Sequence, residues 1–160
     1  MDKMPQQTTL KSVDALIGEK CRTLYTHWEK LRGERMAPRR KEFTLALVGQ
    51  LSSWMWTADV IDDGADFRFR LIGDHITQFI EKAYTGMLLS ELPSNLFFER
   101  VRQTITCCVK NMEPVAASST HSSYENKDHW ETEAVMLPLS ENGEKVTSVM
   151  GILEFWPIGS

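Results

Sequence analysis

Two short segments of alternating apolar and polar residues, joined by a tight turn, constrain this 160-residue chain more than any other feature. Apolar residues recur at every second position in both segments: Trp54, Trp56, Ala58 and Val60 in the first, and Phe67, Phe69 and Leu71 in the second. This period is typical of half-buried β-strands. Asp62-Asp63-Gly64 between them favours a turn, because aspartate tolerates tight backbone geometry and glycine accepts positive φ. The stretch predicts a β-hairpin, with Arg68 and Arg70 on the face opposite the aromatic rings.

The segment after the hairpin has the apolar spacing of helices. Residues 74–80 show it, and so does a longer segment from Ser94 to about Met112. One stripe of the longer helix contains Phe97, Val101, Ile105, Cys108 and Met112. We therefore predict that helices follow the hairpin and that Ser94 caps the longest of them.

After Pro114 the period returns to two, over residues 115–121, 129–139 and 146–156. Asn142-Gly143 predicts a tight turn, so the last two of these strands pair antiparallel. The elements together predict an α+β domain with five strands in a two-plus-three split. We expect the inserted helices to cover one face of the sheet and to leave a pocket between helices and sheet.

The first third of the chain is predicted to form an amphipathic helix over residues 10–33, with Ser12 as N-cap and Gly33 as its end. About three heptads of apolar residues run along it: Leu10, Ile17, Cys21, Leu24, Trp28 and Leu31. Two interpretations are open, because these six residues could form a homodimer interface or pack on their own domain. Residues 1–9 are predicted to be disordered, residues 34–53 to be a basic linker with a short helix, and residues 54–157 to be the sheet domain.

Composition excludes several functional classes. No apolar run approaches the roughly 20 residues of a membrane span, and the N-terminus lacks the apolar core of a signal peptide. Three cysteines form no disulfide framework, so we expect a cytoplasmic protein without a membrane partner. Residues 1–42 carry ten Lys or Arg against six Asp or Glu, and residues 43–160 carry eight against sixteen. The basic segment around Pro38 has no interleaved aromatic residues, so no nucleic-acid partner is expected.

The order of elements resembles that of PAS domains, and several motifs point to a bacterial, mostly alphaproteobacterial, PAS family that opens with a helix. The matching residues are Trp28 with Arg32-Gly33, Pro38-Arg39-Arg40, Phe67-Arg68-Phe69-Arg70-Leu71-Ile72-Gly73, Thr85-Gly86, Leu137-Pro138-Leu139 and Asn142-Gly143. They cover most of residues 28–156. The resemblance implies a five-stranded antiparallel sheet in the order 2-1-5-4-3, and a role in sensing or protein interaction rather than catalysis.

The chain lacks the cofactor signatures of PAS proteins. The Asn-Cys-Arg-Phe-Leu-Gln sequence of flavin photosensors is absent. His75 follows the second strand instead of lying in the long helix, and His27 is the other helical histidine, so haem ligation is not supported. We therefore expect no flavin and no haem.

Candidate site residues come from the predicted pocket. We predict that a ligand contacts Trp54, Trp56, Phe69, Arg70, His75, Tyr84 and Trp130. Arg70 has two open roles, because an arginine binds an anionic ligand bidentately but also pairs with acidic neighbours such as Glu131, Glu133 or an aspartate of the hairpin. The aromatic residues are alternatively plain core.

Few residues of the chain fit a catalytic or metal-binding pattern. No Ser-His-Asp or Cys-His arrangement, Gly-rich phosphate loop or paired acidic cluster is evident, so no catalytic residues are predicted. His121, His129 and Glu131 could be read as a metal set on neighbouring strands, but polar surface explains them better and no metal is expected.

The sequence favours a stand-alone sensory or regulatory module in signal transduction. It would bind a small molecule or a partner protein and form a homodimer through the N-terminal helix. One alternative is a small α+β cone enzyme, similar in shape to nuclear transport factor 2, that acts on a small apolar substrate. A second alternative is a structural interaction module with a filled, ligand-free core.

Overall fold

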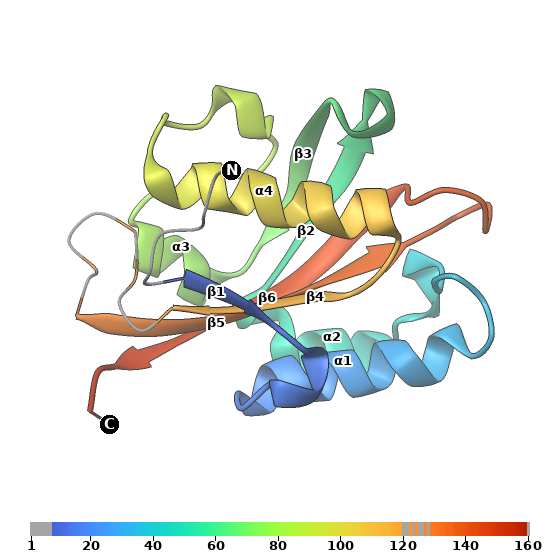
Figure 1. Cartoon of the computed structure of the whole chain (residues 1–160), viewed down its shortest axis with the longest axis horizontal. Coiled ribbons are helices and arrows are strands. Elements are labelled where there is room, and N and C mark those ends of the chain that lie inside the picture. Colours follow the sequence, from blue (N-terminus) through green and yellow to red (C-terminus); the bar gives the residue numbers. More distant parts are fainter. Residues whose placement is uncertain (1–7, 120–121, 123, 125–126, 128, 160) are drawn as a thin grey trace.

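The computed structural model describes residues 8–119, 122, 124, 127 and 129–159. Within this part of the chain, six strands form one antiparallel sheet in the order β1-β4-β5-β6-β2-β3 (Figure 1). The strands are β1 (Thr8–Lys11), β2 (Met55–Ile61), β3 (Asp66–Ile72), β4 (Val115–Ser119), β5 (Trp130–Leu139) and β6 (Ser148–Pro157).

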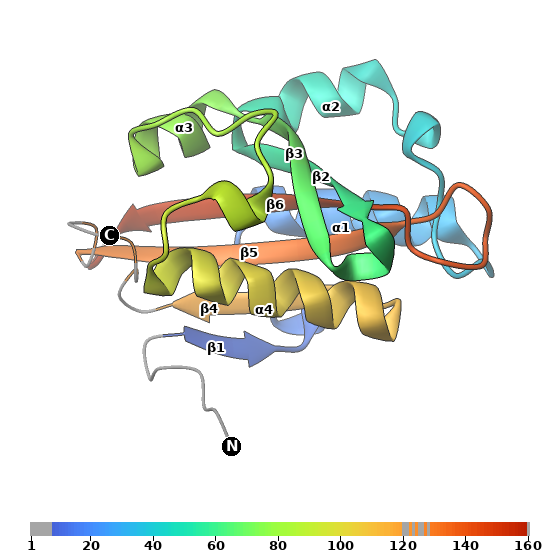
Figure 2. The same ribbon diagram turned by 90° about the horizontal axis from the view of Figure 1, so that it is seen from above.

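Helices cover both faces of this sheet. On one side, here called the α1 face, lie α1 (Glu19–Arg32) and α2 (Leu45–Leu51). On the other side, here called the α4 face, lie α3 (Asp74–Ile80) and α4 (Leu96–Asn111), and Figure 2 shows α4 running along β4 and β5. None of the helices in the described residues combines the length and apolar character that crossing a membrane requires.

The predicted α+β architecture and strand order are confirmed. The five predicted strands correspond to β3-β2-β6-β5-β4, in the order 2-1-5-4-3, and the helices lie between the second and third of them. The cone alternative does not describe this fold, because the β2–β3 hairpin precedes the long helix α4.

The predicted number of strands was wrong, because β1 adds a sixth strand at the edge of β4. It pairs from Thr8 opposite Ser119 to Lys11 opposite Ala116. A run of two threonines and a leucine suits a strand, and it satisfies backbone groups that β4 would otherwise leave open. The heptad pattern had assigned Leu10 to the helix instead.

Helix α1 consequently begins at Glu19, not at residue 10, although it ends before Gly33 as predicted. Ser12 caps a single 3-10 turn at Val13–Ala15 instead. The predicted disordered tail over residues 1–9 was wrong for Thr8 and Thr9, which lie in β1, and its residues 1–7 lie outside the described part of the chain.

Two carboxylates of the sheet fix the start of α1. Glu133 of β5 accepts hydrogen bonds from the backbone N–H groups of Ile17, at 2.9 Å, and Gly18, at 2.7 Å. Glu154 of β6 accepts one from the N–H of Lys20, at 2.6 Å. Negative charge is favourable here, because the first N–H groups of a helix have no partner within the helix. A Cβ at Gly18 would lie 1.5 Å from Oε2 of Glu154, so a larger residue there would displace this carboxylate from the start of α1.

The β2–β3 hairpin has the predicted turn and an irregularity that the sequence pattern did not indicate. Asp62, Asp63 and Gly64 all have positive φ. The register shifts between Thr57 and Ala58, which pair with Leu71 and Phe69. Such a bulge turns the following residues to the opposite face. Phe69 therefore packs in the core of the α4 face, whereas Leu71 packs on the α1 face.

The remaining turns follow their sequence signals closely. At the β5–β6 hairpin, Oδ1 of Asn142 accepts hydrogen bonds from the N–H groups of Glu144 and Lys145. The N-cap of α4 is Asn95, one residue after the predicted Ser94, and its Oδ1 accepts from the N–H of Phe98 at 2.9 Å.

Each face of the sheet has its own hydrophobic core. The α1 face buries Cys21, Leu24 and Trp28 of α1 against Val135 and Leu137 of β5. Because α1 shares this core with the central strands, the N-terminal helix and the sheet form one packing unit. The core of the α4 face is rich in aromatic residues and contains the cavity described next.

Candidate functional site

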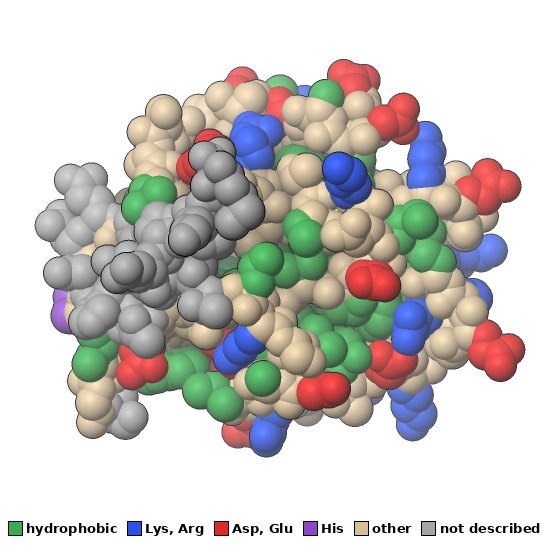
Figure 3. Space-filling view, in the orientation of Figure 1, with side chains coloured by type: hydrophobic (Ala, Val, Ile, Leu, Met, Phe, Trp, Pro, Cys, Tyr) green, Lys and Arg blue, Asp and Glu red, His purple; other side chains and the backbone are tan. Residues whose placement is uncertain are grey.

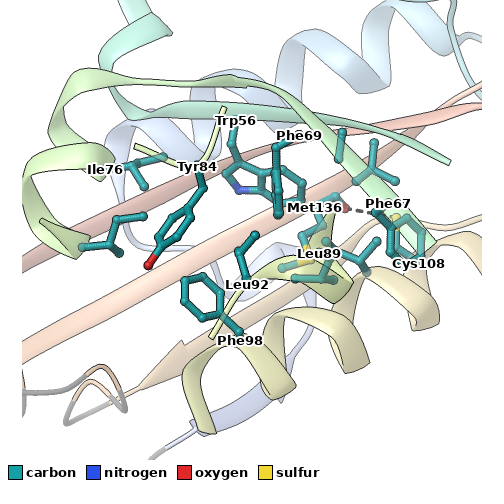
Figure 4. Close-up of a cluster of buried hydrophobic side chains, with 14 of the residues drawn as sticks. Trp56, Phe67, Phe69, Ile76, Tyr84, Leu89, Leu92, Phe98, Cys108 and Met136 are labelled. Atoms are coloured by element: carbon teal, nitrogen blue, oxygen red, sulfur yellow. Dashed lines mark hydrogen bonds between the residues drawn. The ribbon is translucent and has the colours of Figure 1, made fainter. Parts of the chain in front are cut away.

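A cavity of about 120 Å³ lies between α3, α4 and the sheet. Apolar side chains make most of its wall: Trp56, Phe69, Ile72, Ile76, Ile80, Tyr84, Leu92, Phe97, Phe98, Val101, Ala117, Ala134, Met136 and Leu153. In Figure 4 the side chains of Trp56, Phe69, Tyr84 and Phe98 lie around Leu92. The predicted pocket between helices and sheet is therefore present.

The floor of the cavity depends on a glycine in β6. Gly151 lies directly opposite Trp56 of β2 in the register of the two strands. A Cβ on Gly151 would lie 2.6 Å from the Trp56 ring and 2.6 Å from the carbonyl oxygen of Val135. The glycine thus allows the indole to lie across the sheet, where its ring meets Phe69 edge-on at 6.1 Å between centroids.

Helix α4 and the segment before it close the cavity from above. The rings of Tyr84 and Phe98 meet edge-on, with centroids 5.4 Å apart. Helix α4 begins after its cap at Asn95 and contributes Phe97, Phe98 and Val101 to the wall. Apolar surface on three sides makes the cavity a suitable place for a small apolar molecule.

Polar groups line one part of the wall. They come from α4, β4, β5 and the residue Ser122: Arg100, Thr104, Ser118, Ser119, Ser122 and Thr132. Arg100 is 5% exposed, and this burial lowers the pKa of its guanidinium. The Thr104 hydroxyl donates to the carbonyl oxygen of Arg100, one turn earlier in the helix.

Three of the seven predicted ligand residues line the cavity, namely Trp56, Phe69 and Tyr84. Trp130 is half-buried on the same face of the sheet, where it packs edge-on against Phe79 and Phe155. It does not reach the cavity wall.

Arg70 lies away from the cavity, in an ion pair. Its Nε is 2.5 Å from Oδ2 of Asp59 on the neighbouring strand β2. The two side chains are 49% and 31% exposed. Of the two roles left open by the sequence, the structure shows the pairing with an aspartate of the hairpin. Ion pairs this exposed contribute little to stability.

Trp54 and His75 also lie outside the cavity, where they form a stack. Their rings are nearly parallel, with centroids 4.3 Å apart. The Nζ of Lys20 lies 4.7 Å from the centroid of Trp54 on this side. The stack joins the start of α1 to the start of α3, and so links elements on the two faces of the sheet.

The residues that sequence reasoning missed come mainly from α4 and β4. The predicted stripe of α4 contained Phe97 and Val101, but these were assigned to the core and not to the site. An arginine inside an otherwise apolar helix face was the available signal for Arg100. The sequence gives no reason to place the small residues of β4 in a site, because they line the cavity only through the packing of α4 above them.

The predicted dimer residues are used within the chain itself. Cys21, Leu24 and Trp28 are fully buried, and Leu31 packs against the same core. Leu10 and Ile17 are the exposed members of the set. The helix therefore packs on its own domain. A homodimer stays a prediction, and it would need a different contact surface.

The metal alternative gains no geometric support from the described residues. His121 lies outside them, and His129 is exposed just before β5. A different group, Cys21, Glu133 and Glu154, places its donor atoms within 4.8 Å of one another. These carboxylates already hold the start of α1, and burial raises the pKa of the Cys21 thiol. We assign this group a structural role.

The basic segment before α2 is partly neutralised by its own neighbours. Arg35 lies 2.8 Å from Oε1 of Glu42. The hydrogen bond from Arg35 is the main cause that lowers the pKa of Glu42 to about 2. On the face shown in Figure 3, acidic and basic side chains are interspersed over the described surface.

Comparisons with known proteins give one family. The family model of the PAS domain matches residues 18–154. No curated protein matches the chain. Among solved structures, one described as "Flavin Analogue Sheds Light on Light-Oxygen-Voltage Domain Mechanism" is similar, with 10% identity and a TM-score of 0.46 over 70% of this chain and 83% of the other.

Proposed function

Because this chain belongs to the PAS domain family, we propose that it is a sensory signalling module in which a small apolar molecule occupies the cavity beneath α4. The main support for this proposal is the cavity itself, with its aromatic wall. A well-packed interior leaves few voids larger than a water molecule, so this space is a departure from ordinary packing. Apolar cavities near 150 Å³ are known to stay dry and to bind benzene or xenon.

The volume restricts the occupant. About 120 Å³ accommodates a single ring or a short branched chain, which is well below the roughly 300–1,000 Å³ of drug-sized sites. A flavin or a haem would require the walls to move apart. We therefore propose a ligand of one ring and no bound flavin or haem.

The occupant would act on α1 through two connections. The central strands carry residues for both cores on alternate positions, so Met136 lines the cavity while its neighbours Val135 and Leu137 pack beneath α1. The stack of His75, Trp54 and Lys20 joins α3 to α1 at one end of the sheet. A ligand that prefers one packing of α3 and α4 would shift the population of α1 arrangements.

We propose further that a signalling protein in the cytoplasm senses the position of α1, and that the module acts without catalysis and as a homodimer. The free Cys21, Cys107 and Cys108 agree with a reducing compartment. The partner and the dimer are expectations from the family and from the sequence.

Benzene is expected to bind in the cavity with a dissociation constant on the order of 0.1–1 mM, because an apolar ring gains contacts with the apolar part of the wall. Methyl signals of Ile76, Ile80 and Leu153 should shift in carbon-edited NMR during the titration. Ala134→Phe should abolish these shifts by placing a ring in the same space. The matched control is Ala46→Phe, on an exposed position of α2, which should leave the shifts intact.

Absence of any benzene-induced shift in the wild-type protein would contradict the proposal. It would favour the structural interaction module with a closed core, which the sequence left as an alternative.

A further inference from the structure

The cavity wall divides into an apolar part and a polar part with a cationic group. Among the described residues that line it, Arg100 is the only charged one, and it belongs to the second turn of α4. Hydroxyl groups lie in the same part of the wall, including those of Ser119, Ser122 and Thr132. No described lining residue has a carboxylate. The polar residues that border the cavity are therefore hydroxyl-bearing residues and one arginine.

Burial makes this arginine significant. Arg100 is 5% exposed, although charged residues are almost never fully buried unless they are paired. A guanidinium has five N–H donors in a planar fork, so it can bind a neighbour in the chain and a ligand at the same time. The fork matches the two oxygens of a carboxylate, and such charge-assisted hydrogen bonds are about twice as strong as neutral ones.

The apolar part of the wall determines which apolar group the ligand carries beside its carboxylate. Aromatic rings from β2, β3, α4 and the loop residue Tyr84 border the cavity, among them Trp56 and Phe98. Rings favour edge-to-face contact with another ring. The volume leaves space for one such ring and a small substituent.

We propose that the cavity selects a single-ring aromatic carboxylate, with its carboxylate on Arg100 and its ring between Trp56, Tyr84 and Phe98. This inference rests on the proposed function, because it names the class of ligand for the same cavity. It adds that charge, and not only apolar fit, decides which small molecule is bound.

Benzoate and nitrobenzene test this inference, since they have nearly the same shape and differ in charge. Isothermal titration of the wild-type protein should show benzoate bound at least about tenfold more tightly than nitrobenzene, as expected for a hydrogen bond to a charged group. Arg100→Met should remove that preference and leave nitrobenzene binding within about threefold. Arg102→Met, at a neighbouring position of α4 outside the cavity wall, is the matched control and should keep it.

The outcomes separate the two proposals. Equal binding of the two compounds by the wild-type protein would overturn the carboxylate preference and leave the cavity proposal standing, and this comparison needs no variant. Loss of preference in Arg102→Met as well as in Arg100→Met would also overturn it. If the wild-type protein binds neither compound and shows no shift with benzene, the proposed function itself fails.

Discussion

Replacing Trp28 by alanine is expected to lower the free energy of unfolding by about 3–5 kcal/mol, the range found when a buried aromatic residue is truncated. Trp28 is 0% exposed beneath the sheet, and its Nε1–H donates to the carbonyl oxygen of Pro138 at 2.8 Å. Domains of this size are stable by about 5–15 kcal/mol, so the variant would lose a large share of its stability. Urea unfolding followed by circular dichroism measures the change.

Two further variants identify the source of that loss. Trp28→Phe keeps a ring and removes the donor, so it should cost less than the alanine variant. Leu45→Ala, at a position 89% exposed on α2, should change stability by less than about 0.5 kcal/mol. A loss below about 1 kcal/mol for Trp28→Ala would mean that α1 does not pack on its own sheet in solution, and would favour the dimer seam predicted from the heptads.

Replacing Glu133 by glutamine is expected to cost about 3–5 kcal/mol near neutral pH, because one partner of a buried charge pair is removed. Glu133 is 1% exposed, and Lys11 Nζ lies 2.5 Å from its Oε2. The glutamine side chain also offers one oxygen where the carboxylate offers two. Lys11 and the N–H groups of Ile17 and Gly18 would then compete for a single neutral acceptor.

The pH dependence of this cost follows from the pKa of Glu133. Burial raises that pKa, but the hydrogen bonds from Lys11, Ile17 and Gly18 outweigh it, so the folded-state pKa lies below the ordinary value. A carboxylate with a depressed pKa contributes stability above its unfolded pKa, and that stability is lost as the pH falls through the folded pKa. The difference between wild type and Glu133→Gln should therefore be full above pH 5 and shrink in more acidic solution.

Glu154 provides the control for this experiment. Burial raises its pKa and the charge of Glu133 adds to the effect, whereas the hydrogen bond and charge of Lys20 oppose it only in part. A raised pKa has the opposite sign, so this group contributes stability at low pH that is lost as the pH rises. Urea unfolding between pH 3 and pH 8 should show the difference between wild type and Glu133→Gln shrinking below about pH 5, and the difference for Glu154→Gln shrinking in the opposite direction, as the pH rises. Differences that shrink in the same direction would contradict the assignment.

Much of the fold could be predicted from periodicity and turns. Asp62-Asp63-Gly64 and Asn142-Gly143 placed two hairpins correctly, and the change of period after Pro114 placed the last three strands. The prediction failed where one segment fits both a helical and a strand pattern. Leu10 fits a heptad, but it lies in a strand because the edge of β4 was open to it.

The site could be predicted only in part. Whether a residue lines the cavity depends on its own helix or strand and also on the element that packs against it. Trp54 and Trp56 are two positions apart, yet Trp54 lies in a 3-10 turn before the strand and stacks on His75. Arg70 stood out as a charged residue in a strand, but the bulge places it beside Asp59. Arg100 became a candidate only once the packing of α4 on β4 and β5 was known.

Hydrogen exchange of the α1 backbone tests the central claim of sensing most directly. Mass spectrometry would follow the amides of residues 21–32 with and without benzene, at concentrations where NMR shows the cavity to be occupied. We expect occupancy to change their exchange rates by about twofold or more, because the ligand alters the stability of local opening in α1. Ala134→Phe should show no such response. If benzene occupies the cavity and the exchange rates of the α1 amides stay unchanged, the proposal that α1 reports ligand binding is contradicted.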